Sequence, residues 1–567
     1  MFRATAALFI TLATLLLFAI FRLYDLQINK HELYLAKAER QYNYKSEYYD
    51  RGSIYFTKKD GELFSAATVK SGHILAVVPV RFDKKKTDSI YHFLHDELGL
   101  KLNYATFVQK AHKKGDPYEE LLRKLDKKVA AKISKKDFDG VITPLYRYRY
   151  YPGSSLAAHV LGFVAQRADD PKLHGRYGLE KYYDTELFRD DKKLSVNFFA
   201  ELLGGAKEAF VSDKSHGSLI STIEPMVQTE LEKVLQKTAR KWRSKRVSAI
   251  VYNPQNGEII AMASYPNFDL NNFSKVPSVS IYENPLVENV YEMGSIVKAI
   301  TVAAGLESGV ISENSTYNDT GCVVYNNSTI CNYDKRARGV VKVQEILSQS
   351  LNVGASWVYK RMGKKRFKSF FEKLGLTDIS GIDLPNEAVP LVHNLDSPRD
   401  IEYATASFGQ GVAFTPIAMV RALGALGTGY IAVPHVVKAI KRDFGVTVNI
   451  APTEKKRVFS NKTVESISRM LTEVVDSKLD NGKRKKEHYT VAAKTGTAEV
   501  SSRHGGYIKN VYNHTFFGYF PAFNPRFVVL FVNERPQGAK YASQTLTDPF
   551  YEMVDFLINY YNIEPDR

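Results

Sequence analysis

The sequence predicts an α+β protein: one membrane anchor, an elongated mixed domain, and a large C-terminal domain with an antiparallel sheet between helices on both faces. Three observations predict it. The first 21 residues contain a long uncharged apolar run. Strand patterns stand at both ends of residues 218–567, with helical patterns between them, as in an antiparallel α+β domain. The length of 567 residues also exceeds what one hydrophobic core usually holds.

Composition excludes several protein classes. Hydrophobic residues make up 44% of the chain, which rules out disordered and collagen-like proteins. The mean hydropathy of −0.27 excludes a polytopic membrane protein but allows one membrane segment. Lys and Arg number 78 against 61 Asp and Glu, a formal charge of +17, which would suit an anionic partner.

The anchor is predicted at residues 4–21, an 18-residue run without charge. At about 1.5 Å per residue, such a helix nearly spans a hydrocarbon core of ~30 Å. A cleaved signal peptide and a buried core helix are the alternatives, but the run is longer than a typical signal core and no small-x-small cleavage pattern follows it. We therefore expect residues 4–21 to be a transmembrane helix. The flanking charges are a weak guide to its orientation, and residues 1–3 are expected to be a cytoplasmic stub if the large domain lies outside the membrane.

Residues 22–217 are predicted to form the elongated domain, and residues 218–567 the large one. The first region mixes short strands, short helices and lysine clusters; within it, residues 107–136 place apolar residues at roughly helical spacing, which favours a solvated helical face. Near Ser218 a strand leads into a helix with this apolar stripe: Met226, Leu231, Val234 and Leu235.

Alternating segments predict the strands of the C-terminal domain. Val247 to Tyr252 and Glu258 to Ala263 should pair as a hairpin, because Asn256-Gly257 between them favours a tight turn. Further strands are predicted around 488–494, 515–520 and 527–532.

Cys322 and Cys331 are the only cysteines. Asn326-Asn327 could turn a short hairpin between them, which would permit a local disulfide; two unrelated buried thiols are the other reading, and sequence does not decide between them. A C-x8-C spacing without histidine is poor for a metal.

Ser295 and Lys298 form the only S-x-x-K of the chain. Residues three apart share a helix face, so the two side chains should meet, with the serine near a helix N-terminus. A serine hydroxyl needs an adjacent base to act as a nucleophile, and a desolvated lysine with a lowered pKa can be that base.

Two further motifs complete a candidate site. Lys494-Thr495-Gly496-Thr497 ends the predicted strand at 488–494, where a glycine lets a substrate backbone approach and cationic and hydroxyl groups can bind a carboxylate. Ser350-Leu351-Asn352 stands at the start of an apolar helical segment; other S-x-N triplets occur, and only order and context select this one.

These three motifs, in this order, resemble those of the penicilloyl serine transferases, the penicillin-binding proteins and serine β-lactamases. The likeness to class B penicillin-binding proteins extends along the chain, through R-G-S-I at 51–54, Y-P at 151–152 with A-H-V-L-G at 158–162, G-L-E-K-Y-Y-D at 178–184, the hairpin at 253–264, and T-A-S-F-G-Q-G-V-A-F-T-P at 405–416. The chain departs from the family in having S-L-N for S-S-N or S-D-N, and in lacking D-R-N-G after Arg51-Gly52.

The resemblance implies a D-Ala-D-Ala transpeptidase domain and a role for each motif residue. Ser295 would be the nucleophile, Lys298 its base, and Ser350 a proton relay, while Asn352 would bind the donor peptide and steady Lys298. The substrate carboxylate would be held by Lys494, Thr495 and Thr497, with Gly496 giving clearance. The backbone N–H groups of Ser295 and Thr497 would form the oxyanion hole, and no metal or organic cofactor is expected.

The resemblance also implies partners and a location. Stem peptides, lipid-linked precursors and β-lactam antibiotics would bind, and the missing E-D-x-x-F-x-x-H-x-G pattern predicts no glycosyltransferase activity. A SEDS-type membrane glycosyltransferase and division or elongation proteins would then be partners. The catalytic domain would lie outside the bacterial inner membrane, on the periplasmic side, so nucleic acid is not expected as a partner. Asparagine at position 352 favours a division-type enzyme over an elongation-type one.

Two alternatives to a transpeptidase remain open from the sequence. Water could resolve the acyl-enzyme, as in a DD-carboxypeptidase or β-lactamase, although the long pedestal at 22–217 argues against a simple hydrolase. The motifs could instead belong to a non-catalytic penicillin sensor or scaffold, against which the intact Ser295, Lys298 and Lys494 argue.

Overall fold

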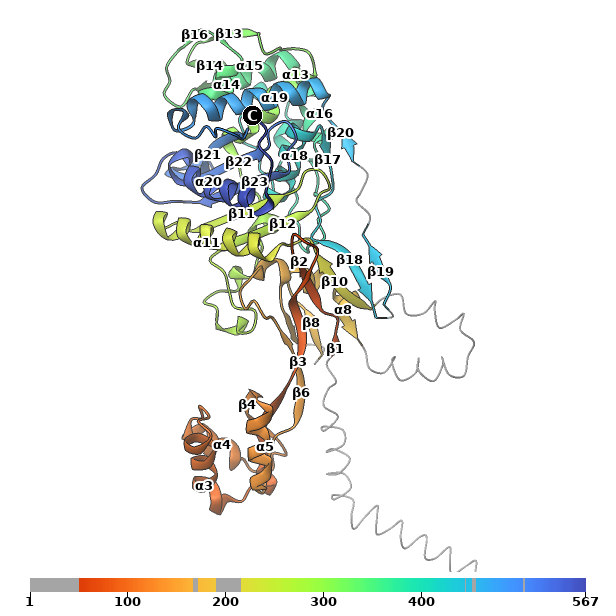
Figure 1. Ribbon diagram of the computed structural model, residues 1–567. Helices are drawn as coiled ribbons and strands as arrows, with labels where there is room; N and C mark the ends of the chain where they lie inside the picture. The colour runs from red at the N-terminus through yellow and green to blue at the C-terminus, as the bar shows by residue number, and fades with distance from the viewer. Residues whose placement is uncertain (1–49, 167–171, 190–215, 444, 451–454, 503–504) are drawn as a thin grey trace, which may run out of the picture. The chain divides into compact units, whose positions relative to one another are not determined.

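The computed structural model describes residues 50–166, 172–189, 216–443, 445–450, 455–502 and 505–567 (Figure 1). The predicted stub at 1–3 and anchor at 4–21 lie outside these residues. Within the described ranges no helix combines the length and apolar character needed to cross a membrane.

The described helices and strands have the following residue bounds. The helices are α3 Thr87–His92, α4 Tyr104–Ala111, α5 Lys127–Lys136, α6 Ala158–Leu161, α7 Gly178–Tyr182, α8 Asp184–Leu187, α11 Pro225–Trp242, α12 Pro285–Glu288, α13 Val297–Glu307, α14 Gln344–Ser348, α15 Asn352–Met362, α16 Lys364–Lys373, α17 Asp400–Ala406, α18 Pro416–Thr428, α19 Asn461–Glu473 and α20 Ala542–Tyr561. The strands are β1 Asp50–Arg51, β2 Ile54–Thr57, β3 Leu63–Val77, β4 Glu119–Leu125, β5 Val141–Ile142, β6 Leu145–Tyr150, β7 Val164–Gln166, β8 Leu173–Gly175, β9 Phe188–Arg189, β10 Gly217–Ser221, β11 Arg246–Tyr252, β12 Ile259–Tyr265, β13 Thr316–Asp319, β14 Cys322–Tyr325, β15 Ser328–Cys331, β16 Gly339–Lys342, β17 Tyr430–Ile431, β18 Val437–Arg442, β19 Thr447–Asn449, β20 Lys456–Arg457, β21 Ala492–Ser501, β22 Tyr507–Phe520 and β23 Phe527–Glu534.

Contacts divide the chain into two compact units. In the described residues, the first unit contains 50–51, 69–149 and 189, and the second contains 52–68, 150–166, 172–188 and the described residues from 216 onward. Segments 52–68, 150–166 and 172–188, which lie in the predicted elongated domain at 22–217, thus belong to the same compact unit as the C-terminal residues. The division at residues 217 and 218 stays a prediction.

The first unit has its own small core, formed by buried residues that include Leu75, Val77, Ile90, Phe107 and Ile133. The basic segment 107–136 is not one helical face, as its spacing suggested. It forms the end of α4, then strand β4, which pairs with β3, and then α5. The prediction was wrong in the middle because two short helices flank the strand, and their apolar positions together imitate a longer helical period.

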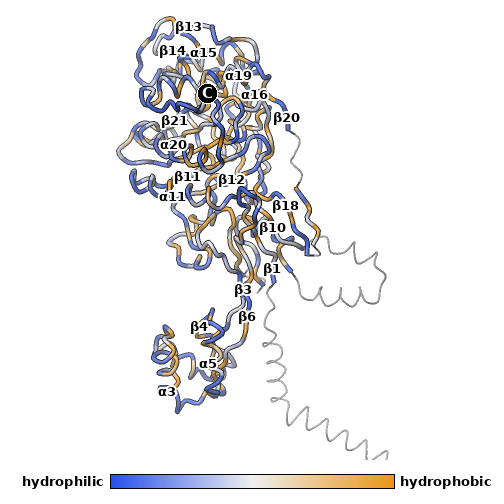
Figure 2. Tube along the Cα trace, viewed as in Figure 1, coloured by the Kyte–Doolittle hydropathy of each residue, from blue (hydrophilic) through white to orange (hydrophobic). Residues whose placement is uncertain are grey.

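The second unit is built on a five-stranded antiparallel sheet in the order β12-β11-β23-β22-β21 (Figure 1). Successive side chains of a strand point to opposite faces. Phe516 and Phe531 therefore pack with α11 and α20 on one face, whereas Phe517 and Leu530 join the core of the other face, which contains α13, α18 and α19. Figure 2 shows the apolar character of β11 and β12, whose residues are almost all buried. The prediction of an antiparallel sheet with helices on both faces is confirmed.

The predicted hairpin of the sheet is also confirmed. β11 and β12 pair antiparallel across the Asn256-Gly257 turn, where Gly257 has φ +89°. Strand β21 begins at Ala492 rather than at His488, because the Thr490 N–H donates to Asp566 Oδ1 near the C-terminus (2.7 Å) instead of to a strand. The strand continues to Ser501, so the K-T-G-T motif lies within it and not at its end.

Helix α11 differs from its predicted stripe at the first position. Glu224 caps the helix by accepting a hydrogen bond from Val227 N, and Pro225 is the first helical residue. Val227, Leu231 and Val234 are fully buried, while Met226 is 53% exposed. The apolar stripe therefore begins one residue later than the sequence pattern indicated.

Cys322 and Cys331 lie opposite each other on the β14–β15 hairpin and form a disulfide. Asn326 and Asn327 turn the hairpin with φ values of +47° and +62°, a left-handed region that asparagine tolerates better than most residues. The structure contains the local disulfide that the sequence left open.

Candidate active site

Ser295 lies in a 3₁₀ turn, Gly294–Ile296, that leads directly into α13. The turn is packed tightly from two sides. Gly294 has φ +58° and its N–H donates to Gly409 O (3.1 Å), and a Cβ built on Gly294 would lie 2.7 Å from the carbonyl oxygen of Thr497. Only glycine fits here, so the backbone around the half-buried serine is fixed.

Lys298 contacts Ser295 as the three-residue spacing predicts. Its Nζ lies 2.9 Å from Ser295 Oγ, 2.6 Å from the carbonyl oxygen of Ser350 and 3.2 Å from Ser350 Oγ. The lysine is fully buried at 0% exposure, with its Nζ 5.9 Å from the centre of the Phe408 ring. The amine therefore joins two of the predicted motifs inside the protein.

Burial changes the protonation of both lysines of the site. Desolvation lowers the pKa of Lys298 well below its ordinary value, and the charge of Lys494 lowers it further. Desolvation lowers the pKa of Lys494, which is 4% exposed, to about 8. A neutral Lys298 has a lone pair, and at 2.9 Å that lone pair can accept the hydroxyl proton of Ser295.

Ser350 lies between the two lysines. Its Oγ accepts from Lys494 Nζ at 3.1 Å as well as from Lys298, and its backbone has φ +56° immediately before α15. A serine in this left-handed region is strained by on the order of 1–3 kcal/mol, which its surroundings must offset. The serine hydroxyl proton can point toward a bound substrate, because both lysines donate to its oxygen.

The K-T-G-T segment lies on β21, at the edge of the sheet, where β22 is its one pairing partner among the described strands. Lys494 points into the buried network, while Thr495 and Thr497 are half-buried. Thr497 Oγ1 accepts a hydrogen bond from Ala542 N (3.1 Å), which leaves its own proton free to be donated. The oxyanion hole from the N–H groups of Ser295 and Thr497 stays a prediction.

Gly496 is required for a reason other than substrate clearance. A Cβ at this position would lie 2.3 Å from Thr515 Oγ1 and 2.6 Å from the carbonyl oxygen of Met293. The glycine therefore lets β21 approach the turn that carries Ser295.

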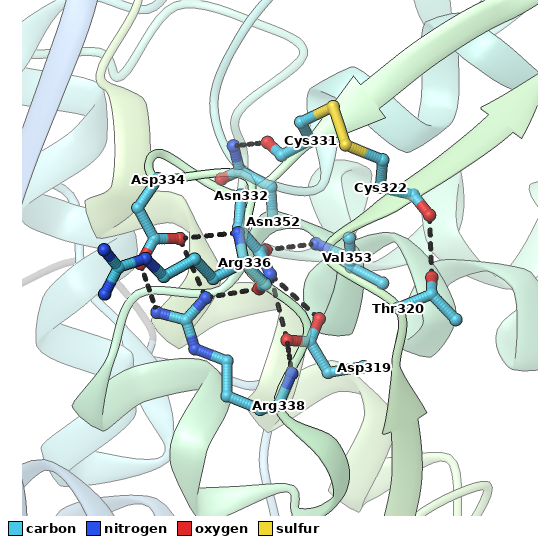
Figure 3. The surroundings of a disulfide bond; sticks show 10 residues. All are labelled: Asp319, Thr320, Cys322, Cys331, Asn332, Asp334, Arg336, Arg338, Asn352 and Val353. Atoms are coloured by element: carbon cyan, nitrogen blue, oxygen red, sulfur yellow. Dashed lines mark hydrogen bonds and ion pairs between the residues drawn. A yellow bond between two sulfur atoms is a disulfide. The ribbon is translucent and has the colours of Figure 1, made fainter.

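Asn352 binds the disulfide hairpin, and its role in steadying Lys298 stays a prediction. Its Nδ2 donates to the carbonyl oxygen of Cys331 at 2.9 Å (Figure 3), and the hydrogen bonds of Lys298 Nζ go to Ser295 and Ser350. The disulfide hairpin lies beside the start of α15 and accepts this amide N–H. Binding of a donor peptide by Asn352 stays a prediction.

Sequence reasoning missed other residues that shape the site. Gly409, with φ +80°, holds the serine turn, and the neighbouring Phe408 ring covers Lys298. Their only signal was the T-A-S-F-G-Q-G block, which carried no assigned role. Glu292 accepts from the Tyr507 hydroxyl (3.1 Å) and from Gly411 N (3.2 Å), and burial raises its pKa.

In the part of the chain that the structure covers, no group of three or more His, Cys, Asp and Glu residues is arranged to hold a metal ion.

Two protein families match this chain. Residues 247–554, more than half of the chain, match the penicillin binding protein transpeptidase domain, and residues 46–197 match the penicillin-binding protein dimerisation domain.

Two similar proteins support these family matches. Stage V sporulation protein D of Bacillus subtilis is 31% identical over 75% of this chain and 66% of its own length. Peptidoglycan D,D-transpeptidase FtsI of Escherichia coli K12 is 27% identical over 88% of this chain and 84% of its own length.

Solved structures show the same fold. Penicillin binding protein 3 of Mycobacterium tuberculosis superimposes with a TM-score of 0.65 and 26% identity, covering 74% of this chain and 92% of that one. Penicillin Binding Protein 2X of Streptococcus thermophilus has a TM-score of 0.72 over 91% of this chain and 81% of its own, and at 20% identity it supports the fold alone. The chain is thus a class B penicillin-binding protein, in which a dimerisation domain precedes a serine D,D-transpeptidase domain.

Proposed function

We propose that this chain cross-links peptidoglycan stem peptides through an acyl-enzyme on Ser295. The observation that carries the proposal is the 2.9 Å contact between Ser295 Oγ and the buried Lys298 Nζ, which places a nucleophile beside an amine of lowered pKa. The names of the relatives support the same activity, since FtsI of E. coli is a peptidoglycan D,D-transpeptidase.

The first half-reaction forms the acyl-enzyme. Lys298 takes the proton of Ser295 as Oγ bonds to the carbonyl carbon of the penultimate D-Ala, and the N–H groups of Ser295 and Thr497 stabilise the oxyanion. The peptide bond to the terminal D-Ala then breaks. Ser350 passes the proton to the leaving nitrogen, because its hydroxyl lies between Lys298 and Lys494.

The second half-reaction transfers the acyl group. An amine of a neighbouring stem peptide attacks the ester carbonyl and loses a proton to Lys298. As the new peptide bond forms, the bond from the carbonyl carbon to Ser295 Oγ breaks and Lys298 returns the proton to that oxygen. Lys494, Thr495 and Thr497 hold the carboxylate of the donor before D-Ala leaves. Lys494 is the cation of this group, and the hydroxyl proton of Thr497 is free to be donated.

β-Lactams are expected to acylate the same serine. Penicillin binding protein 3 of M. tuberculosis was solved in complex with aztreonam and with ampicillin, and the family resemblance extends this binding to the present chain. We further propose that residues 4–21 anchor the protein in the inner membrane with the catalytic domain in the periplasm. A SEDS-type glycosyltransferase and cell-division proteins are the proposed partners, the latter supported by the FtsI relatives.

Covalent labelling tests the nucleophile. A fluorescent penicillin should label the full-length protein and should fail to label Ser295→Ala, with Ser312→Ala, an exposed serine of another S-x-N triplet, as the matched control. Absence of labelling on the wild type would favour a non-catalytic scaffold. A thioester donor with a D-amino acid acceptor then separates transfer from hydrolysis: mainly hydrolysed donor would favour a DD-carboxypeptidase or β-lactamase activity.

A further inference from the structure

The start of helix α15 carries the S-L-N motif, yet it lacks a capping side chain of its own. The residue before the helix, Leu351, has no side chain that can accept from the first free N–H groups. Unsatisfied N–H groups at a buried helix start are costly, so partners are expected from elsewhere in the fold. The partner here comes from the loop after the disulfide hairpin.

Asn332 supplies that cap from a distant part of the sequence. Its Oδ1 accepts from Val353 N, in the first turn of α15, at 3.2 Å (Figure 3). Its Nδ2 donates to both oxygens of Asp319, at 2.9 and 3.0 Å. Asn332 is 2% exposed and Asp319 is 0% exposed, so a buried carboxylate fixes the orientation of the capping amide.

The same loop holds the other residues around Ser350. Cys331, the residue before Asn332, accepts the side-chain hydrogen bond of Asn352 through its carbonyl oxygen. Arg338 Nε donates to Gln349 Oε1 at 3.1 Å, and its guanidinium forms two hydrogen bonds of 2.8 Å with Asp334. Residues on both sides of Ser350 are therefore bound to one short segment, 331–338.

Ser350 depends on such support. Its φ of +56° is strained for a serine, and a strained residue persists only where its neighbours fix the backbone. Lys298 binds the Ser350 carbonyl, and the segment 331–338 binds the flanking residues. Loss of the second support would allow the backbone to relax away from the lysines.

We propose that Asn332, oriented by the buried Asp319, is a positioning residue that holds Ser350 and Asn352 in place for acyl transfer. This inference rests on the proposed function, because it assigns Asn332 a role in the same acylation. The hydrogen bonds of the Asn332 side chain go to Asp319 and Val353, so its effect passes through α15.

The test is the second-order rate of acylation by a fluorescent penicillin, measured on the full-length protein and divided by the number of sites titrated at completion. Asn332→Ala is expected to lower this rate by about 10- to 100-fold, since a displacement on the order of 1 Å can cost 10²-fold. Asn318→Ala is the matched control: this residue lies beside Asp319 on β13 but is exposed, and its rate should stay within about twofold of wild type.

Exchanging the side chains of Asn332 and Asp319 should rescue the acylation rate. Asn332→Asp alone places two carboxylates at hydrogen-bond distance and should slow acylation as strongly. In the double variant with Asp319→Asn, the amide nitrogen at 319 can donate to the carboxylate at 332, and that carboxylate still accepts from Val353 N. The amide oxygen at 319 remains available to accept from Arg338 N. The double variant should recover a rate within about threefold of wild type.

Dividing the acylation rate by the number of titrated sites separates an effect on the position of Ser350 from an effect on folding. A purely structural role would reduce the melting temperature and the number of active sites but leave the rate per site at the wild-type value, and that result would overturn the proposal. If Asn332→Ala is not recovered folded, Asp319→Asn takes its place with the same expectation and the same refuting result. An unlabelled wild type would contradict the proposed function itself, whereas a labelled wild type with unaffected variants contradicts only this inference.

Discussion

Replacing Lys494 with methionine should stabilise the protein at neutral pH while impairing its chemistry. Lys494 is 4% exposed, and burial lowers its pKa from 10.5 to about 8, so the folded site disfavours the protonated form that exists at pH 7. A shift of this size corresponds to about 3 kcal/mol. Methionine removes that cost but also removes the hydrogen bonds to Ser350 Oγ and Thr495 O, at about 1 kcal/mol each. The net expectation is a gain of roughly 1 kcal/mol in the free energy of unfolding.

The pH dependence of this difference is the sharper prediction. Between pH 8 and 10.5 the unfolded chain keeps a proton on Lys494 that the folded protein has released, so the stability of the wild type rises with pH relative to the variant. Removing the charge of Lys494 also lets the pKa of Lys298 rise, which acts in the same direction. The variant should therefore be the more stable protein at pH 7 and the less stable one near pH 10.5.

Tryptophan fluorescence provides the measurement. The two tryptophans, Trp242 on α11 and Trp357 on α15, both belong to the compact unit that contains the site, so urea unfolding followed by fluorescence reports on that unit. The midpoints of wild type and Lys494→Met are compared at pH 7 and pH 10 with the same denaturant slope. A variant that is less stable at pH 7, or a difference that stays constant with pH, would show that burial does not lower the pKa of Lys494.

Three further changes test the site. Lys298→Arg keeps a cation but has no neutral form near pH 7, so acylation should fall by about 10²–10⁴-fold in a penicillin-labelling time course; a wild-type rate would exclude Lys298 as the base. Replacing both Cys322 and Cys331 with serine removes a disulfide that joins residues nine apart in the sequence, and should lower the free energy of unfolding by about 2–3 kcal/mol, measured from the urea midpoint. An unchanged midpoint would contradict a stabilising disulfide. Gly496→Ala should cost about 1–3 kcal/mol and slow labelling, because its Cβ would lie 2.3 Å from Thr515 Oγ1; normal stability would mean that β21 can move aside.

The parts of the site that sequence predicted are those with a local rule behind them. Ser295 and Lys298 share a helix turn, so their spacing alone placed the two side chains together, and the 2.9 Å contact follows. The hairpin of β11 and β12 was likewise predicted from alternation and a turn signal. Ser350 and Lys494 are 144 residues apart, and only the family resemblance brought them into one site.

Two features that the sequence did not predict arise from long-range contacts that override a local pattern. The strand predicted from His488 begins later because Asp566, near the C-terminus, binds the backbone of Thr490. Asn352 donates to the carbonyl oxygen of Cys331, which is 21 residues away along the chain. The residues adjacent to Thr490 and Asn352 in the sequence do not predict the partners Asp566 and Cys331.

Ser350 shows why the motif residues do not define the site by themselves. A non-glycine residue at φ +56° is unfavourable, so the sequence S-L-N would not adopt this geometry on its own. Lys298 binds the Ser350 carbonyl, and Cys331 and Asn332, which belong to none of the three motifs, bind the residues that follow it. Under the proposed role of Asn332, the serine hydroxyl stays between two lysines because a buried carboxylate, Asp319, fixes the amide that caps α15. The chemistry of this site therefore depends on a structural network that can vary in sequence as long as its hydrogen bonds are kept, which is the property that the exchange of Asp319 and Asn332 would reveal.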